Sequence, residues 1–393
     1  MKIVIASSGL GHVARGIETW AADLTRALLA RGLNVTLCKG GGQPISPHEK
    51  VLNCWQRSSN NTRRLLTWLP SRLTWRLGLA SPYGIEQTTF AIALIDHLRQ
   101  NNIDLLHVQD PQVALIVQRA QKVDVIKTRT ILAHGTEEPP TFLKKITYLQ
   151  HLTPWHLTDA REAGAYKPTW QAIPNFVDTN QFCPGPAGNL RAQLGIPASA
   201  LVLLSVAAIK RKHKRIDYLV NEFAQLRQQN PTLPAWLIIA GSQEPGTDEL
   251  IQEAKNRLGE RVKFLIRFPR NQMPDLYRTA DLFTLASLKE MMPIALLEAM
   301  SSGLPCITQH HPVLQWMTGA RGETIDMQTP GALAHAATTL FLDTQRRAAI
   351  STAIRRHCQS NFSTDTILKQ ILNYYHFVMT HDQSITQPHR QAA

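Results

Sequence analysis

The sequence predicts an α/β protein built from two tandem, doubly wound, Rossmann-like domains that face a cleft. Three observations support this prediction. The 393 residues exceed what one ordinary hydrophobic core accommodates. Short apolar runs alternate with amphipathic helical segments, which is typical of a parallel sheet with helices on both faces. The alternation occurs twice, on either side of a Pro- and Gly-rich stretch at 174–197, which we interpret as a linker.

The first series of elements predicts an N-terminal domain at 1–173. Its apolar pattern indicates strands and helices, in this order: strand 2–6, helix 16–31, strand 34–38, helix 85–101, strand 103–108, helix 113–121 and strand 128–133.

The second series predicts a domain at 174–365, followed by a helix at 366–380 that packs back on the N-terminal domain and a disordered tail at 381–393. Its elements are, in order, strand 201–207, helix 217–230, strand 235–240, helix 249–258, strand 262–266, helix 273–280, strand 282–285 and strand 305–308. In such folds ligands bind beyond the carboxyl ends of the strands.

Composition excludes several classes of protein. Hydrophobic residues make up 44% and charged residues 18%, as in soluble globular proteins. No apolar run approaches the roughly 20 residues that span a bilayer, and the strand at Lys2 begins without a basic-then-apolar leader. The five cysteines are scattered and include no C-x-x-C pair, which argues against a disulfide framework or a zinc site. We therefore expect a cytoplasmic protein.

Part of the net charge of +13 gathers in a basic, Trp-bearing excursion of the first domain at about 40–85. Residues 50–85 contain six Lys and Arg, three Trp and no acidic residue. Such a stretch can lie on an anionic membrane surface, which would make the protein peripheral at the inner membrane face. A solvated excursion is the alternative. No nucleic-acid motif accompanies the charge, so nucleic acid is not expected as a partner.

Two glutamates, Glu290 and Glu298, mark the segment with the strongest functional signal. After the strand at 282–285, Pro293 suits the first position of a helix and Gly303 the position just past its end. The unpaired N–H groups of the helix start favour an anionic phosphate. We therefore expect the two carboxylates to face hydroxyl groups at either end of a sugar nucleotide. The alternative is a surface helix with two solvated glutamates.

Two other enzyme classes match single features. The loop at 9–14 (G-L-G-H-V-A) fits a dinucleotide fingerprint, but the second strand ends in C-K-G at 38–40, where that fingerprint expects an acid. An NADP-dependent oxidoreductase stays an alternative. A glycoside hydrolase could use Glu290 and Glu298 as acid and base, but a helix amino terminus between them favours the charged form of both and opposes the acid role.

A basic run directly follows the first strand of the second series and precedes a helix, a position that suits diphosphate binding. It includes Lys210, Arg211, Lys212 and Lys214. The sequence contains no Asp-x-Asp pair, so no metal site is expected and these cations would neutralise the leaving group. A solvated basic turn is the alternative.

These motifs together resemble the retaining glycosyltransferases of family 4 (glycosyl transferases group 1), which have the two-domain GT-B fold. The strongest match is the E-x7-E pair Glu290 and Glu298 within K-E-M-M-P-I-A-L-L-E-A-M-S-S-G-L-P. Supporting matches are I-P-N-F-V-D at 173–178, Y-R-T-A-D at 277–281 and R-G-I-E at 15–18. The resemblance covers nearly the whole chain except the basic excursion and the tail.

The resemblance implies a role for each matched residue of the second domain. Glu298 would hold the ribose hydroxyls of the nucleotide, Glu290 would contact the donor sugar, and Lys214 would bind phosphate. Arg267 is a candidate contact to the base. The start of the helix would meet the diphosphate and the sugar through Met292, Pro293, Ile294 and Ala295.

In the first domain, Gly16 matches a glycine whose missing side chain lets the N-terminal loop approach donor and acceptor. His134, at a strand end, resembles a histidine that touches the donor sugar. The loops after two strands supply acceptor-side candidates, Gly11, His12 and Asp110.

Several positions depart from the family pattern. Ala207-Ala208 stands where Gly-Arg is usual, so the missing guanidinium would have to be replaced by Lys210, Arg211 or Lys212. Arg215 and Met291 replace two usual glycines, and Arg15 stands where a Gly-Gly pair commonly begins.

The resemblance implies transfer of a sugar from a UDP- or GDP-type donor to an acceptor hydroxyl, with retention of anomeric configuration and without a metal or other cofactor. The acceptor would be a glycan, a lipid-linked molecule or a small molecule, as in polysaccharide or glycoconjugate biosynthesis. Two alternatives share the fold: a non-catalytic protein that binds a sugar nucleotide or glycan, favoured by Ala208, and a sugar-nucleotide epimerase.

Overall fold

A computed structural model describes residues 1–13, 15–68 and 78–381. The remaining residues, which include Trp75 and nearly all of the predicted tail, lie outside the described residues.

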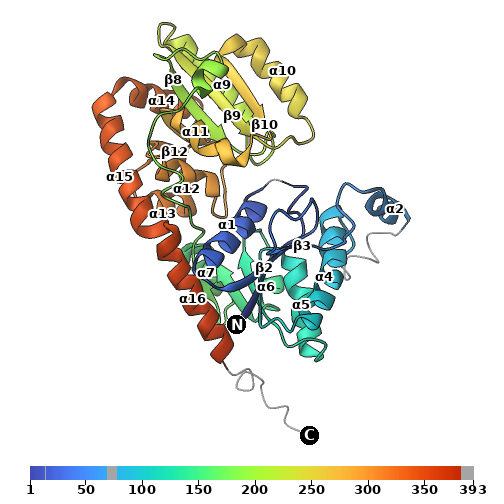
Figure 1. Cartoon of the computed structure of the whole chain (residues 1–393). Helices are drawn as coiled ribbons and strands as arrows, with labels where there is room; N and C mark the ends of the chain where they lie inside the picture. Colours follow the sequence, from blue (N-terminus) through green and yellow to red (C-terminus); the bar gives the residue numbers. More distant parts are fainter. Residues whose placement is uncertain (14, 69–77, 382–393) are drawn as a thin grey trace. The chain divides into compact units, whose positions relative to one another are not determined.

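The chain forms two compact units. Unit 1 contains Met1–Val13, Ile17–Ile173 and the described residues from Leu368 onward. Unit 2 contains Arg15, Gly16 and Pro174–Ile367. Each unit has its own parallel sheet (Figure 1) and its own hydrophobic core.

Unit 1 is built on a seven-stranded parallel sheet in the order β3-β2-β1-β4-β5-β6-β7, which changes direction between β1 and β4. Its strands are β1 Lys2–Ser7, β2 Asn34–Lys39, β3 Glu49–Val51, β4 Leu105–Val108, β5 Arg129–His134, β6 Tyr148–His151 and β7 Gln171–Ala172. Its helices are α1 Gly16–Ala30, α2 Asn60–Trp68, α4 Pro82–Gln100, α5 Pro111–Lys122, α6 Pro140–Leu143 and α7 Pro154–Glu162.

Helices α4 and α5 cover one face of this sheet because their apolar sides follow the helical period. Phe90 and Leu94 of α4 and Val117 of α5 are buried against the strand residues Val4 and Leu106. Each such side chain contributes roughly 1.5–3 kcal/mol when it leaves water. The central strands are buried along nearly their whole length, as expected for a parallel sheet covered on both faces.

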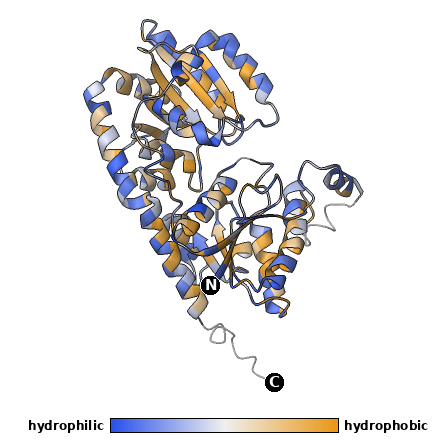
Figure 2. Ribbon diagram, in the orientation of Figure 1, coloured by the Kyte–Doolittle hydropathy of each residue, from blue (hydrophilic) through white to orange (hydrophobic). Residues whose placement is uncertain are grey.

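Unit 2 has a six-stranded parallel sheet in the order β10-β9-β8-β11-β12-β13, with the change of direction between β8 and β11. Its strands are β8 Leu201–Val206, β9 Ala235–Gly241, β10 Val262–Ile266, β11 Leu282–Leu285, β12 Cys306–Gln309 and β13 Glu323–Ile325. Its helices are α8 Leu190–Gln193, α9 Ile216–Gln229, α10 Thr247–Leu258, α11 Met273–Arg278, α12 Ile294–Ser301, α13 Pro312–Thr318, α14 Ala332–Leu342 and α15 Thr344–Phe362, with short 3-10 turns η2 Gly259–Arg261 and η3 Arg270–Gln272. Figure 2 shows its strands as mainly hydrophobic and α10 and α15 as mixed.

The prediction of two Rossmann-like domains is confirmed, since both sheets have the strand order of a doubly wound fold. The interpretation of 174–197 as a linker is wrong, because this segment packs into unit 2. Phe182 is buried and its carbonyl accepts a hydrogen bond from Ser301 Oγ at 2.5 Å. Val177 N donates to the Phe362 carbonyl at 3.0 Å.

The last helix, α16 Thr364–Thr380, spans the range where a C-terminal helix was expected. From Leu368 onward it belongs to unit 1. Tyr375 Oη lies 2.8 Å from His107 Nδ1, and Tyr374 Oη donates to the Thr169 carbonyl at 2.7 Å. These hydroxyls satisfy polar groups inside the core of unit 1.

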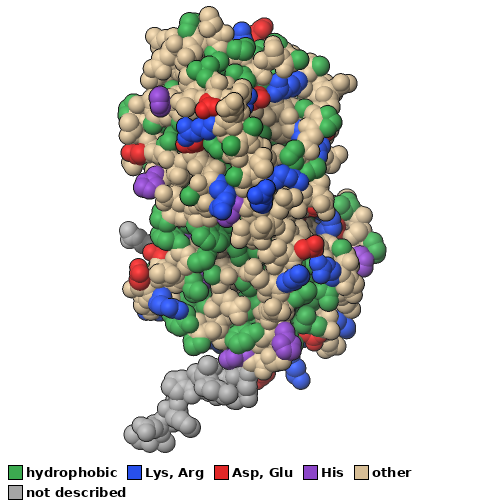
Figure 3. All heavy atoms as spheres, turned by 90° about the vertical axis from the view of Figure 1, so that its left-hand side faces the viewer, with side chains coloured by type: hydrophobic (Ala, Val, Ile, Leu, Met, Phe, Trp, Pro, Cys, Tyr) green, Lys and Arg blue, Asp and Glu red, His purple; other side chains and the backbone are tan. Residues whose placement is uncertain are grey.

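The basic excursion contains ordered elements rather than one exposed stretch. Strand β3 extends the sheet edge, and Leu52 is buried. Helix α2 buries only Thr62, whereas Trp68 at its end is 83% exposed. Figure 3 views the protein from the side of α16 rather than that of α2, and on that face basic side chains are scattered among acidic and uncharged ones.

Candidate functional site

Lys214 and Glu290 meet where the strand order of unit 2 reverses. Lys214 lies in the loop after β8 and Glu290 in the loop after β11. These strands pair directly, with Phe283 opposite Leu204, so both loops leave the same edge of the sheet. The Lys214 ammonium and the Glu290 carboxylate form an ion pair with side chains 18% and 9% exposed. The structure thus brings together the predicted phosphate lysine and the predicted sugar-binding glutamate.

The amino end of α12 follows a short turn after Glu290, since the helix begins at Ile294. Pro293 occupies the N-cap in an extended conformation, one position earlier than predicted, and the helix starts at Ile294. Asn175 Nδ2 donates to the Met292 carbonyl at 3.0 Å, and Asn175 N contacts Met292 Sδ at 3.1 Å. The I-P-N-F-V-D motif therefore fixes the backbone that leads into α12.

Glu298 lies inside α12 and is 2% exposed. Its Oε2 accepts a hydrogen bond from Tyr277 Oη at 2.8 Å, and its Oε1 forms an ion pair with Arg270 of η3. Burial, with the nearby Glu298 carboxylate, raises the pKa of Tyr277 well above its usual value, so Tyr277 stays a hydrogen-bond donor. Arg270 was missed by the sequence reasoning. Only its place after β10, in the segment that precedes the Y-R-T-A-D motif, hints at it.

The cations of the 210–215 loop differ in their surroundings. Arg211 pairs with Glu253 at 2.5 Å, so this candidate substitute for the missing arginine lies in an exposed ion pair. Arg215 has a left-handed φ of 51°, and its guanidinium lies 4.0 Å above the Tyr218 ring and donates to the Met327 carbonyl at 3.1 Å. This packing offsets the roughly 1–2 kcal/mol that the left-handed conformation costs a non-glycine residue.

Lys210 is half-buried and Lys212 is exposed in the same loop. Arg267 is exposed after β10 with a φ of 53°, and its N–H donates to the Gly241 carbonyl at 2.9 Å. A Cβ on Gly241 would lie 1.8 Å from the Ala207 carbonyl oxygen, so the chain passes too closely there for any side chain.

In unit 1, His134 ends β5 beside His151, which ends β6. Their rings are edge to face with centroids 5.6 Å apart. Burial lowers the pKa of His134 to about 4, so the imidazole is neutral near pH 7. Its Nε2 accepts a long hydrogen bond from Glu138 N at 3.4 Å. Gly16, which is grouped with unit 2, is exposed at the start of α1.

One acceptor-side candidate, His12, contacts a buried acid that the sequence reasoning missed, Glu86 of α4. His12 Nε2 lies 2.9 Å from Glu86 Oε2, and the Arg57 guanidinium pairs with Glu86 at 2.5 Å. Although burial alone would raise it, hydrogen bonds from His12 and Arg57 lower the pKa of Glu86 to about 2. Arg57, one of the basic residues of the 50–85 stretch, therefore neutralises an internal carboxylate.

Asp110 and Gly11 lie in the loops that follow β4 and β1, respectively. Asp110 is fully buried, and its carboxylate accepts hydrogen bonds from Ser8 N at 2.7 Å and Tyr83 Oη at 2.6 Å. Gly11 has a φ of 98°, and a Cβ there would lie 2.1 Å from the Gly41 carbonyl oxygen. Asp110 thus ties together the loops after β1 and β4.

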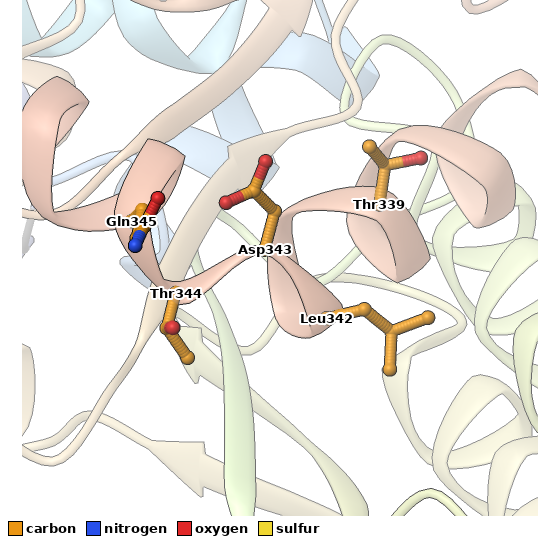
Figure 4. A pocket seen from close by; sticks show the side chains of 5 residues that line it. All are labelled: Thr339, Leu342, Asp343, Thr344 and Gln345. Carbon is orange, nitrogen blue, oxygen red and sulfur yellow. The ribbon is translucent and has the colours of Figure 1, made fainter.

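Other parts of the described chain offer little chemistry. An open surface pocket at the α14–α15 junction, shown in Figure 4, is lined by Thr339, Leu342, Asp343, Thr344 and Gln345. The Asp343 carboxylate caps α15 by accepting from Arg346 N at 2.8 Å, so its role is structural. Within the described ranges, no three His, Cys, Asp or Glu side chains are arranged to hold a metal ion. The helices of these ranges include none that is long and apolar enough to cross a bilayer.

The match to a known protein family lies within the second unit. Residues 187–357 match the family model described as glycosyl transferases group 1. The chain is 31% identical over 216 residues to a D-inositol 3-phosphate glycosyltransferase of Salinispora tropica, covering 51% of this chain and 44% of the relative. The chain spans about half the length of the curated relatives it matches.

Two solved structures share the fold across the chain. A sucrose-phosphate synthase from Thermosynechococcus elongatus has a TM-score of 0.75 at 20% identity, with 96% of this chain and 98% of that chain covered. The HepE protein of Anabaena, solved in complex with UDP and glucose, has a TM-score of 0.74 at 18% identity, with coverage of 96% and 99%.

Proposed function

We propose that the chain transfers a sugar from a nucleotide-diphosphate donor to an acceptor hydroxyl with retention of configuration, because residues 187–357 match the family model of the group 1 glycosyl transferases. The observation that carries this proposal is the meeting of Lys214, Glu290 and the amino end of α12 where the strand order of unit 2 reverses. Ligands of doubly wound sheets bind at that point.

In this proposal the donor diphosphate lies at the amino end of α12, where backbone N–H groups and the helix dipole favour an anion. As the bond between the sugar C1 and the phosphate oxygen breaks, Lys214 stabilises the negative charge on the leaving diphosphate. The acceptor oxygen bonds to C1 on the same face, and its proton passes to the leaving phosphate. Glu290 orients Lys214 and contacts the sugar, and Glu298 holds the ribose.

The metal-independent character of this proposal rests on lysine taking the place of a divalent cation. The exposed Lys212 and the half-buried Lys210 are proposed to add positive charge near the diphosphate in place of the arginine missing at Ala208. The roles of Arg267, Gly16 and His134 at the donor stay predictions.

The donor nucleotide is proposed to be UDP. HepE and its complexes with UDP and UDP-glucose support this choice because they share the fold. A thermal-shift comparison of UDP, GDP and ADP tests it, since a ligand that binds the folded state raises the unfolding midpoint. A larger rise in the unfolding midpoint with GDP than with UDP would show that the donor nucleotide is GDP rather than UDP.

Release of free UDP from a UDP-sugar, with and without candidate acceptors, tests the activity itself. Acceptor-dependent release supports transfer. Binding of the UDP-sugar without release would support a non-catalytic protein, and conversion of the sugar without any acceptor would support an epimerase.

The acceptor is proposed to be lipid-linked, with α2 of unit 1 touching an anionic membrane surface. Trp68 is 83% exposed, and Arg63 and Arg64 are exposed on the same helix. All five cysteines are free thiols, which fits a reducing cytoplasm. Co-sedimentation with vesicles of phosphatidylglycerol tests this contact. Unchanged binding of a variant with Trp68, Arg63 and Arg64 replaced by Ser would rule it out.

A further inference from the structure

Arg270, Phe182 and Tyr277 form a cluster of contacts around Glu298. Its guanidinium pairs with Glu298 Oε1 and lies 5.0 Å above the Phe182 ring. Phe182 packs edge to face on Tyr277 at 5.8 Å, and Tyr277 Oη donates to Glu298 Oε2. The two oxygens of one carboxylate are therefore held from two sides.

The side chains of this cluster differ in how far they are exposed to solvent. Phe182, Tyr277 and Glu298 are buried, whereas the Arg270 side chain is 40% exposed. A buried carboxylate needs a cationic partner to stay ionised, because a single neutral hydrogen bond does not offset its lost hydration. Arg270 is such a cationic partner of Glu298, and its side chain is partly exposed to solvent.

A carboxylate oxygen has two lone pairs and can accept hydrogen bonds from more than one donor. A carboxylate whose orientation is fixed can therefore accept from two neighbouring hydroxyl groups of a ligand. Hydrogen bonds to an ionised group are about twice as strong as those between neutral groups.

We propose that Arg270 is a positioning residue that fixes the Glu298 carboxylate for the 2′- and 3′-hydroxyls of the donor ribose. This inference rests on the proposed function and adds a determinant that the E-x7-E pair alone does not contain. By fixing this carboxylate, Arg270 makes the protein discriminate a ribonucleotide from its deoxy counterpart.

Calorimetry with the full chain tests this, using UDP and 2′-deoxy-UDP, and GDP and 2′-deoxy-GDP if GDP binds better. The wild-type protein should prefer the ribonucleotide by about tenfold or more, the effect expected of a hydrogen bond to a charged group. Arg270→Ala should lower this ratio to within about threefold of unity by weakening the ribonucleotide alone. Arg270→Lys, which restores the charge, should recover at least half of the lost ratio on a logarithmic scale.

Arg257→Ala is the matched control, because Arg257 lies on α10 and contacts Asn221 rather than Glu298. It should leave the ratio unchanged. Thermal unfolding shows that each variant is folded. If Arg270→Ala keeps the wild-type ratio, or tightens the ribonucleotide, the inference is overturned while the proposed function stands. If neither UDP nor GDP binds the wild-type protein, both fail.

Discussion

Lys214 and Glu290 form an ion pair although they lie 76 positions apart in the sequence. The pairing of β8 with β11 places them at the same edge of the sheet, beside the amino end of α12. A cation held in this place by a carboxylate is oriented before any ligand arrives, which is how preorganised charge stabilises a transition state.

Replacing Lys214 by Ala should therefore lower kcat by on the order of 10² or more, because charge on the leaving diphosphate would lose its nearest cation. The donor KM should change less. The measurement is acceptor-dependent UDP release. Lys255→Ala, an exposed lysine on α10, serves as the control. A Lys214 variant within a few-fold of wild type would remove its assigned role.

Replacing Glu298 by Ala should act mainly on nucleotide affinity. Loss of hydrogen bonds to a charged group costs about 1.5–3 kcal/mol, so the Kd for UDP should rise roughly tenfold to a hundredfold. Calorimetry measures this directly. An unchanged Kd would show that the buried carboxylate does not bind the nucleotide.

Addition of EDTA should leave the transfer rate unchanged, since the proposed charge neutralisation uses lysine. The assay is UDP release before and after chelation, with readdition of Mg²⁺ or Mn²⁺ as the control. Loss of activity that either metal restores would contradict the metal-independent mechanism.

Unit 1 should lose stability in acid because the pKa values of three of its buried histidines are lowered. Burial lowers the pKa of His107 to about 3 and of His134 to about 4. Burial, with His134 and His156 nearby, lowers the pKa of His151 to about 3. The unfolded chain binds these protons below about pH 6.5, so stability present above that pH is lost as pH falls towards 4.

Each histidine should contribute on the order of 2 kcal/mol of this loss between pH 7 and pH 4.5. Urea unfolding across this range measures the slope. His151→Leu should flatten it, whereas His48→Gln, at an exposed site, should not. Equal slopes for wild type and His151→Leu would show that His151 is solvated or already paired.

Tyr375→Phe should destabilise unit 1 by about 1–3 kcal/mol, because His107 Nδ1 would lose its partner inside the core. Tyr166, which is 44% exposed, offers the matched control, and Tyr166→Phe should change the free energy of unfolding by less than about 0.5 kcal/mol. Equal effects of the two substitutions would mean that the Tyr375 hydroxyl contributes no stabilising hydrogen bond to His107.

Local patterns in the sequence predicted much of the fold. The strands at the centre of both sheets are continuous apolar runs, and the helices between them carry a clear helical period. Pro293 and Gly303 indicated the limits of α12 to within one residue. These signals depend on neighbours within a few positions, which is why sequence reasoning finds them.

Elements with weak local signals were missed. Edge strands β3 and β7 are three and two residues long, too short for a period of two to appear. Strand β6 (Y-L-Q-H) places Gln150 and His151 where apolar residues are expected. Helix α15 is mainly polar, and its buried side is only Ile354, Cys358 and Phe362.

The partners of the candidate site residues could not be predicted for a related reason. Glu290 and Glu298 were visible from their spacing, but Arg270 reaches Glu298 through a chain reversal. Glu86 had no motif around it, and only the fold brings His12 and Arg57 to its carboxylate. Contacts of this kind follow from topology rather than from local sequence.

A crystal structure of the full chain with UDP tests the central claim most directly. We predict the β-phosphate within about 3 Å of Lys214 Nζ and of the backbone N–H groups of Ile294 and Ala295, with ribose hydroxyls on Glu298. A diphosphate bound away from α12, with Lys214 still paired only to Glu290, would contradict it.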